Sequence, residues 1–259
     1  MRAHRVATFV LTLLALAGAA AVGAAPASAV AQGTPAVVGQ NPFAVRLTMT
    51  NIPRPDGTRY NSACSGSLIS PTWIITAGHC FHNVNRTRVS GPTPYSTTAV
   101  LNTVDVTKYR GDVRSVTYVK QSPSNDIALA RLSAPVTDVV PLRLSTSRPA
   151  VQQLLTLAGW GATSSINPTP STKLITGLVK VTTVGSNTVL VAGYSPRADT
   201  SACAYDSGAP YFTVPRAALP VLVSVESNGP DCPHTGPETT SRVDTVIPWI
   251  RSVVTDLPK

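Results

Sequence analysis

Three short segments of the 259-residue chain carry side chains that could act together in nucleophilic catalysis. Ser207 lies between Asp206 and Gly208 in a run of turn-forming residues, which predicts a tight loop. A serine hydroxyl is a weak nucleophile, so it needs a base to take its proton and donors to hold the oxyanion that forms. His79 follows an apolar segment and could be that base, and Asp126 precedes another apolar segment and could orient the imidazole. These residue types indicate acyl-transfer chemistry.

The strings around the three residues resemble those of the chymotrypsin–trypsin family of secreted serine endopeptidases, in particular its bacterial trypsin-like members. The family's strings T-A-A-H-C, D-I-A-L and G-D-S-G-G-P correspond here, in the same order, to T-A-G-H-C at 76–80, D-I-A-L at 126–129 and Y-D-S-G-A-P at 205–210. Further similarity lies at 64–69, 159–161 and 243–249. The resemblance therefore spans nearly all of the chain after its N-terminal segment.

The resemblance implies a protease mechanism. Ser207 would attack the scissile carbonyl carbon, His79 would act first as general base and then as general acid, and Asp126 would orient His79. An esterase on an α/β-hydrolase fold is the poorer alternative, because the sequence has no G-x-S-x-G and its triad order differs. Two other histidines, His82 and His234, lie outside the matching strings and are expected at the surface.

The resemblance also implies an all-β fold of two six-stranded antiparallel β-barrels with a C-terminal α-helix. The first barrel is expected at about 43–140, the second at about 150–243 and the helix at about 245–255. The composition agrees with a turn-rich folded chain, because it has 23 Pro and 17 Gly and only 13% charged residues. Apolar patterning predicts strands at 43–49, 64–69, 72–76, 113–119, 127–132, 174–183, 187–191 and 220–225.

Two connecting features are also predicted from the residues. The segment 50–63 is expected to be a loop with a turn at Asp56-Gly57. At the end of the chain, Asp244 and Thr245 are expected to cap the helix, with Pro248 in its first turn.

The first 29 residues read as a secretory signal peptide. They begin with a basic stretch, continue with an apolar run and end at Ala27-Ser28-Ala29, a small-residue cleavage site. A membrane anchor is the alternative, but the apolar run is short for a span. We therefore expect residues 30–259 to form a secreted, monomeric peptidase domain without membrane association after cleavage.

The four cysteines of an exported chain indicate two disulfides, although the sequence alone permits three pairings. The family resemblance implies Cys64–Cys80 and Cys203–Cys232. A zinc site is the alternative, but no C-x-x-C pair or histidine cluster supports it, and we expect no metal and no cofactor. The formal net charge is +9, but the basic residues are scattered, so nucleic acid is not an expected partner and protein or peptide substrates are.

The oxyanion donors are the first departure from the family. The resemblance implies that the backbone N–H groups of Tyr205 and Ser207 hold the oxyanion, but the family nearly always has glycine where this chain has Tyr205. Tyrosine keeps the N–H, yet a backbone angle that suits only glycine would strain it. Catalysis could thus be normal, weakened or restricted to certain substrates. The alternative function is a catalytically weak homologue that acts as a binding protein.

The specificity pocket is the second departure. The resemblance places Ser201 at its floor, Ser224, Val225 and Glu226 on one wall, and Glu238 near another. Trypsin-like members carry aspartate at the position of Ser201, so plain trypsin specificity is not supported. We expect an apolar or mixed preference, with Glu238 as a solvated surface acid. If Glu238 instead points into the pocket, basic side chains could still be preferred. The natural substrate and the preferred side chain before the cleaved bond stay open.

In this family a new N-terminal amine pairs with the acid before the nucleophile, here Asp206. Two starting residues fit. Val37-Val38-Gly39 looks like the family's first residues, but only four residues then separate it from Pro42. Val30 directly follows the signal site and begins V-A-Q-G-T-P-A, which resembles the family's I-V-G-G-T-P-A. We expect Val30, exposed by signal cleavage alone.

Overall fold

The structure, a computed structural model, describes residues 30–216 and 218–258. The signal peptide expected at 1–29 lies outside the described residues.

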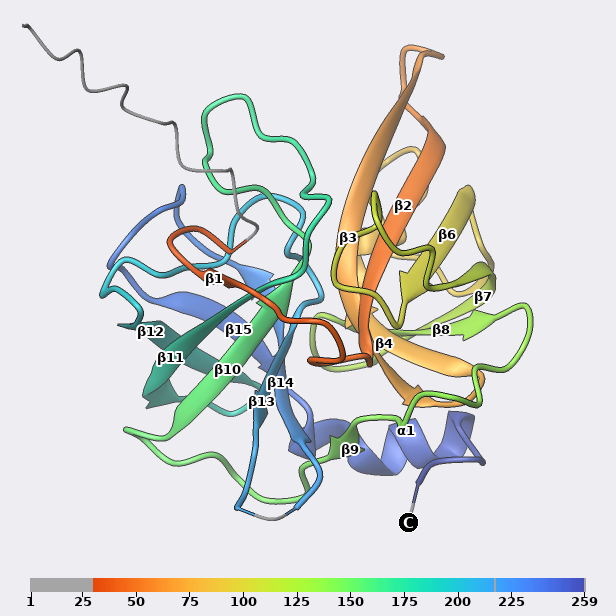
Figure 1. The fold of residues 1–259 in the computed structure, drawn as a ribbon. Helices are drawn as coiled ribbons and strands as arrows, with labels where there is room; N and C mark the ends of the chain where they lie inside the picture. Colours follow the sequence, from red (N-terminus) through yellow and green to blue (C-terminus); the bar gives the residue numbers. More distant parts are fainter. Residues whose placement is uncertain (1–29, 217, 259) are drawn as a thin grey trace, which may run out of the picture.

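The first half of the chain forms a closed antiparallel barrel (Figure 1). The ring runs β7-β6-β2-β3-β4-β8 and closes through the pairing of β7 with β8. A short strand, β5 (Gly91–Pro92), pairs with β7 outside the ring. The ring strands are β2 (Ala44–Pro53), β3 (Arg59–Ser70), β4 (Trp73–Ala77), β6 (Ser96–Leu101), β7 (Asp112–Gln121) and β8 (Ile127–Leu132).

The second half forms a similar barrel beside the first (Figure 1). Its ring runs β11-β10-β13-β14-β15-β12 and closes through β11 and β12. Two short strands lie outside this ring, β1 (Thr34–Pro35) on β11 and β9 (Arg143–Leu144) beside β14. The ring strands are β10 (Leu154–Gly159), β11 (Ile175–Val184), β12 (Thr188–Ser195), β13 (Pro210–Thr213), β14 (Val221–Asn228) and β15 (Glu238–Arg242). The predicted fold of two six-stranded antiparallel barrels is confirmed.

Alternating apolar residues explain how the barrels close around their cores. In β2, Val45, Leu47 and Met49 are buried, and the residues between them are only partly buried. Burying such side chains is the main favourable term in folding, at about 1.5–3 kcal/mol each. The first core also reaches across to the C-terminal helix, from which Ile247 and Ile250 pack into it. The helix is therefore anchored to this core.

The hairpin of β2 and β3 is longer than predicted. The segment 50–63 was expected to be a loop, but β2 runs to Pro53 and β3 begins at Arg59. The chain reverses around Asp56-Gly57, as predicted, with the Gly57 N–H donating to the Arg54 carbonyl at 3.0 Å. The loop prediction is wrong because backbone pairing between β2 and β3, not apolar alternation, holds this polar segment in strands. A bulge between Met49 and Ile52 lets the pairing continue. The hairpin projects beyond its barrel in Figure 1.

The C-terminal helix is present but shorter than predicted. α1 spans Ile247–Val253 and follows a 3₁₀ turn at Asp244–Val246. Pro248 lies in the first turn, as expected, but the predicted capping by Asp244 and Thr245 is wrong. The Asp244 carboxylate instead accepts hydrogen bonds from Arg242, from Nη2 at 2.6 Å and from Nε at 3.0 Å. Within the described residues, none of the helices has the length and apolar character needed to span a bilayer.

Candidate active site

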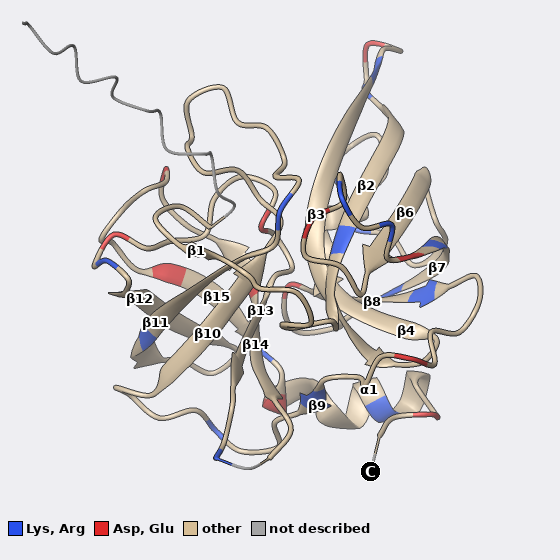
Figure 2. Ribbon diagram, in the orientation of Figure 1, with Lys and Arg blue, Asp and Glu red and all other residues tan. Residues whose placement is uncertain are grey.

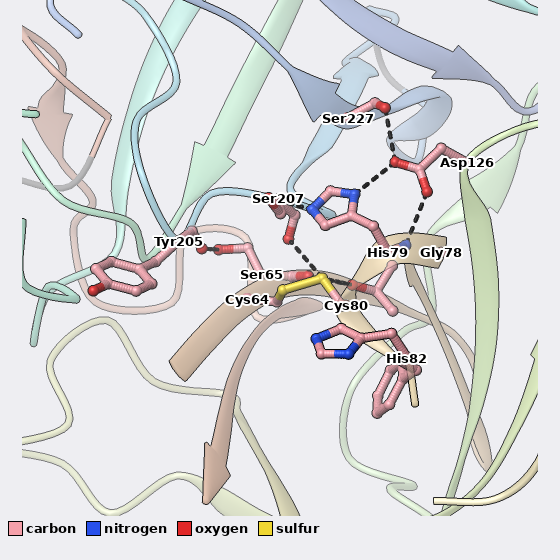
Figure 3. The surroundings of a disulfide bond; sticks show 12 residues. Cys64, Ser65, Gly78, His79, Cys80, His82, Asp126, Tyr205, Ser207 and Ser227 are labelled. Carbon is pink, nitrogen blue, oxygen red and sulfur yellow. Dashed lines mark hydrogen bonds and ion pairs between the residues drawn. A yellow bond between two sulfur atoms is a disulfide. The ribbon is translucent and has the colours of Figure 1, made fainter. Parts of the chain in front are cut away.

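Strand pairing brings His79 and Asp126 together. His79 lies in the 3₁₀ turn Gly78–Cys80 that follows β4, and Asp126 immediately precedes β8. β4 and β8 are neighbours, with Ala77 opposite Ile127, so the residues just beyond this pair lie side by side. Ser207 comes from the second barrel, on the loop that leads into β13. The three residues thus meet between the barrels (Figure 3).

The three side chains form one continuous hydrogen-bonded chain. His79 Nε2 lies 2.8 Å from Ser207 Oγ, and His79 Nδ1 lies 2.7 Å from Asp126 Oδ2. The other carboxylate oxygen, Asp126 Oδ1, accepts a hydrogen bond from the His79 backbone N–H at 2.9 Å. An ionised carboxylate accepts only, so Nδ1 carries the proton and Nε2 presents its lone pair to the hydroxyl. The imidazole therefore holds the tautomer that can take a proton from Ser207.

Two residues that the sequence did not indicate support Asp126. Ser227 Oγ donates to Asp126 Oδ2 at 2.7 Å, and Arg88 Nη1 lies 3.7 Å from Asp126 Oδ1. Burial acts to raise the pKa of Asp126, but the hydrogen bonds from His79 and Ser227 act against it and prevail, so this pKa is lowered. Asp126 stays ionised. No local string signals Ser227, because its role depends on where β14 lies.

The nucleophile loop is closely packed against β3. The Ser65 backbone N–H donates to the Ser207 carbonyl at 2.9 Å. Gly208 has φ +88°, and a Cβ there would lie 2.1 Å from Thr76 Oγ1, so only glycine fits. The predicted disulfides Cys64–Cys80 and Cys203–Cys232 are both present, and the first lies beside Ser207 (Figure 3). All four cysteines are thereby used, which removes the thiolates that a zinc site would need.

Tyr205 has the backbone conformation that favours glycine. Its φ is +74°, in the left-handed region. The loop is fixed around it, since the Tyr205 carbonyl accepts from Ser65 Oγ at 3.3 Å and the Tyr205 hydroxyl donates to the Pro168 carbonyl at 3.3 Å. The tyrosine is accommodated at a local cost of roughly 1–3 kcal/mol, and the loop keeps the shape that a glycine would give it.

Replacing Tyr205 by glycine is therefore expected to leave the acylation rate on small ester substrates within about twofold, since the backbone already has the glycine-like angle. Replacement by valine should lower that rate by at least about tenfold, because a β-branched residue is a strong outlier at positive φ. Single-turnover kinetics with a chromogenic ester measures both. A large rise for the glycine variant would show that tyrosine distorts the oxyanion loop.

A cavity of about 340 Å³ lies beside Ser207 and His79 on the second-barrel side. Of the five residues predicted for the specificity pocket, Glu226 lines this cavity. The other four, Ser201, Ser224, Val225 and Glu238, are buried and are not among its lining residues. Ala202, Cys203 and Asp231, which were not predicted, line it together with Glu226.

Glu238 is buried, which corrects its assignment as a solvated surface acid. It is 2% exposed, and the Ala202 backbone N–H and the Tyr211 hydroxyl both bond to its carboxylate. Tyr211 Oη also lies 2.7 Å from Glu226 Oε2. One hydroxyl proton cannot serve two carboxylates, so one glutamate must itself be protonated.

The surroundings of Glu226 favour its protonated form. Burial, followed by the nearby charge of Glu238, raises the pKa of Glu226 well above its usual value. A protonated Glu226 can donate to Tyr211 Oη, which leaves the Tyr211 hydroxyl proton for the contact with Glu238. His234 Nε2 lies 3.4 Å from Glu238 Oε1, and this contact raises the pKa of His234. Glu226 lines the cavity, where its raised pKa favours the neutral form, and Glu238 lies buried behind it.

Neither His82 nor His234 is the surface residue that was expected. His82 is 7% exposed, and the side chain of His234 is 10% exposed. His82 packs edge-on against Tyr95, and the backbone N–H of His234 donates to Ser201 Oγ at 3.3 Å. Short polar strings read as surface loops, and these partners lie 13 and 33 residues away in the chain.

At the other end of the site, Val30 is fully buried beside Asp206. The Asp206 carboxylate accepts hydrogen bonds from the backbone N–H of Gly161 at 2.7 Å, of Cys203 at 3.0 Å and of Val30. Burial raises the pKa of Asp206 to about 7. Val37, the other candidate first residue, is 69% exposed.

Comparison with known proteins agrees with this geometry. A family model described as Trypsin matches residues 30–250. Trypsin, alkaline B, from Manduca sexta is 30% identical over 268 residues, which cover 93% of this chain and 98% of that protein. Transmembrane protease serine 7 from Mus musculus is 30% identical over 217 residues, which cover 75% of this chain and 26% of that protein.

Proposed function

The chain belongs to the trypsin family of serine proteases, and on that premise we propose that it is a secreted serine endopeptidase of the bacterial trypsin-like type. It hydrolyses peptide bonds through an acyl-enzyme on Ser207. The observation that carries this proposal is the unbroken chain from Ser207 Oγ through His79 to Asp126, with links of 2.8 and 2.7 Å.

The geometry supports the following steps. His79 Nε2 takes the proton of Ser207 Oγ as the oxygen attacks the scissile carbonyl carbon. The imidazolium that forms is stabilised by ionised Asp126, whose lowered pKa keeps it charged. His79 then gives this proton to the leaving amine, and the acyl group stays on Ser207. A water molecule enters, loses a proton to His79, and releases the acid and the free serine.

The alternative is a catalytically weak homologue that binds proteins without cleaving them. Tyr205 is the feature behind it, but its φ of +74° keeps the loop in a glycine-like shape, which favours the enzyme. Titration with a fluorophosphonate probe separates the two, because labelling needs the nucleophile, its base and the oxyanion donors together. Stoichiometric labelling of Ser207 supports the enzyme. A folded protein that does not label would be the binding homologue.

The neutral acid in the cavity makes substrate preference depend on pH. Because the pKa of Glu226 is raised, this wall residue is neutral at lower pH and gains a negative charge as the pH rises, beside Asp231, the other acid that lines the cavity. Cleavage after lysine relative to cleavage after leucine should therefore increase by about tenfold over that rise. The ratio of the two kcat/KM values cancels any effect of pH on the chemical step, which is common to both substrates.

The Glu226→Gln variant tests this directly. It keeps the shape of the side chain and its contact with Tyr211 but cannot ionise, so the lysine-to-leucine ratio should stay flat with pH. A ratio that rises equally in both proteins would assign the effect to another group.

We further propose that the mature chain begins at Val30 and that its amine activates the enzyme by pairing with Asp206. The burial of Val30, and its N–H at the Asp206 carboxylate, support this start. The match to the Trypsin family model also begins at residue 30. Protein and peptide chains are the substrates that a protease of this family takes.

A further inference from the structure

A second hollow opens at Ser207, distinct from the cavity that holds Glu226. Its volume is about 230 Å³, and it shares only His79 and Ser207 with that cavity. We call it the Arg86 groove. Its defining residues are Tyr60, Arg86, Tyr205 and the Cys64–Cys80 disulfide. Both hollows therefore open at the nucleophile, from different sides of it.

A rigid turn presents Arg86 to the groove. The Asn83 side-chain oxygen accepts from the backbone N–H groups of Asn85 and Thr87, each at 3.0 Å. The Arg86 N–H donates to the Asn83 carbonyl at 3.1 Å, and Arg86 has φ +62°, in the left-handed region. An arginine held in this conformation is fixed by its surroundings, so the guanidinium starts from a defined place.

The neighbouring histidine orients the guanidinium. His82 Nδ1 lies 2.7 Å from the Asn83 carbonyl, which can only accept, so Nδ1 carries the proton. His82 Nε2 is then an acceptor, and Arg86 Nη1 donates to it at 3.3 Å. Only one edge of the guanidinium is used in this way. Its remaining N–H groups are available to a carboxylate, which arginine can bind through two parallel hydrogen bonds.

A second arginine strengthens the positive field. The guanidinium carbons of Arg54 and Arg86 lie 4.5 and 5.3 Å from the centre of the Tyr60 ring. Stacking on an aromatic face holds a guanidinium without using up its N–H donors. Among the ion pairs between described residues, none involves Arg54 or Arg86. The nearest acid along the hairpin, Asp56, accepts hydrogen bonds from the N–H and hydroxyl of Thr58, and its charge offsets part of that of Arg54, so Arg86 is the main source of the field.

The two hollows have opposite charge character. The residues that line the Arg86 groove include no Asp or Glu, and those that line the other cavity include Glu226 and Asp231 but no Lys or Arg. Figure 2 shows Lys or Arg segments on the projecting hairpin of β2 and β3 and on the loop beside it. A substrate that crosses Ser207 therefore passes from a cavity whose charged lining residue is Asp231 to a groove whose charged lining residue is Arg86.

From this geometry we propose that the Arg86 groove binds the leaving-group side of the substrate and selects an acidic side chain within the three residues after the cleaved bond. This proposal rests on the proposed protease function. Arg86 binds the substrate carboxylate, Arg54 adds to the field, and the apolar floor beside the disulfide receives the neighbouring residue. The partner is an extended peptide segment, and charge complementarity identifies its chemistry.

Acyl transfer to added peptides tests the groove separately from the first cavity. The acyl-enzyme is formed from one small ester, and tripeptide amides then compete with water for it. The peptide amine attacks the acyl carbon and loses a proton to His79, a new amide bond forms, and Ser207 Oγ leaves and takes that proton from His79. Each tripeptide carries Glu, Gln or Lys at one of three positions in an alanine background. The ratio of amide to acid product reports only leaving-side contacts.

The wild-type protein should prefer Glu over Gln by about fivefold at one of these positions, and the preference should shrink in about 0.5 M salt. Arg86→Gln should reduce the preference to less than about twofold, and Arg86→Glu should favour Lys instead. Arg251→Gln, a matched change of an exposed arginine on α1, should leave the wild-type preference unchanged.

The possible results separate the two proposals. A protein that labels with fluorophosphonate and transfers its acyl group to Glu, Gln and Lys peptides equally would overturn the groove proposal and leave the protease intact. A preference for Glu that survives in Arg86→Glu would also overturn it. A folded protein that neither labels nor turns over the ester would overturn the protease, and the groove proposal with it.

Discussion

Replacing Ser207 by alanine is expected to lower kcat for peptide hydrolysis by about 10⁶-fold, the size of loss found when a serine–histidine–carboxylate unit loses its nucleophile. The reason is geometric, since Ser207 Oγ is the oxygen within 2.8 Å of His79 Nε2. His79→Ala should lose about as much, and the double variant little more, because the residues act as one unit. Steady-state kinetics on a fluorogenic peptide, with enzyme concentration fixed by active-site titration of the wild type, gives these ratios.

Two further variants make this result specific. Asp126→Asn should lose less, about 10⁴-fold, because it keeps the shape of the site but supports the wrong tautomer of His79. Ser252→Ala, at an exposed serine on α1, should retain wild-type activity. All variants should unfold within a few degrees of the wild type, since none of these changes opens a core cavity. A Ser207→Ala protein with appreciable peptidase activity would remove Ser207 from the mechanism.

The triad residues could be proposed from the sequence because each lies in a short local string. His79 and Asp126 end up adjacent because each lies at the end of one of two neighbouring strands, and their chain positions next to β4 and β8 could be read locally. Ser227 could not be found in this way. Its hydroxyl reaches Asp126 because the fold places the end of β14 beside that carboxylate, although 101 residues separate the two in the chain.

Strands, too, were predicted where the signal is local and missed where it depends on distant partners. β8 was predicted at 127–132 and is found at Ile127–Leu132, because nearly all of its residues are buried and apolar. β15, with the sequence E-T-T-S-R, shows no apolar pattern and was missed. It forms because β12 and β14 pair with it on both sides, so its backbone polar groups are satisfied by long-range partners. Apolar patterning detects strands whose own side chains are apolar and buried. It misses strands that form because neighbouring strands pair with them.

Glu238 shows the same limit for a charged residue. An acid in a Pro- and Gly-rich string reads as exposed, because burying an unpaired carboxylate is costly. Tyr211 and the Ala202 N–H offset that cost by bonding to the carboxylate, and both precede it in the chain by more than 20 residues. The acidic cluster behind the cavity, which governs the expected pH dependence of substrate choice, therefore became visible only in three dimensions.

The second large effect is expected at the N-terminus. A chain that begins at Val30 should be fully active, and a chain that retains Ala29 should show less than about 1% of its activity, because only the first has an ammonium group to pair with buried Asp206. Losing one partner of a buried ion pair typically costs about 3–5 kcal/mol. Asp206→Asn in the Val30 chain should lose activity to a similar degree. Active-site titration of the three proteins measures the active fraction.

The pairing of the Val30 amine with Asp206 should also change how the stability of the fold depends on pH. With an amide at Val30, burial raises the pKa of Asp206 to about 7, so the folded state holds a proton that the unfolded state releases near its ordinary pKa of 3.8. Stability is then fully present below about pH 4 and falls as the pH rises toward 7. The chain that retains Ala29 should lose about 3 kcal/mol of unfolding free energy between pH 5 and pH 8.

In the chain that begins at Val30, the ammonium group favours ionised Asp206 and should largely remove this pH dependence. Urea unfolding of both chains at pH 5 and pH 8 compares them directly. N-terminal sequencing of the active secreted protein gives the natural start. A start at Val37 would contradict the proposal, because residues 30–36 would be gone, and with them the buried backbone that lies against Asp206. Val37 and Val38 are 69% and 70% exposed, so neither fills that place in the folded chain.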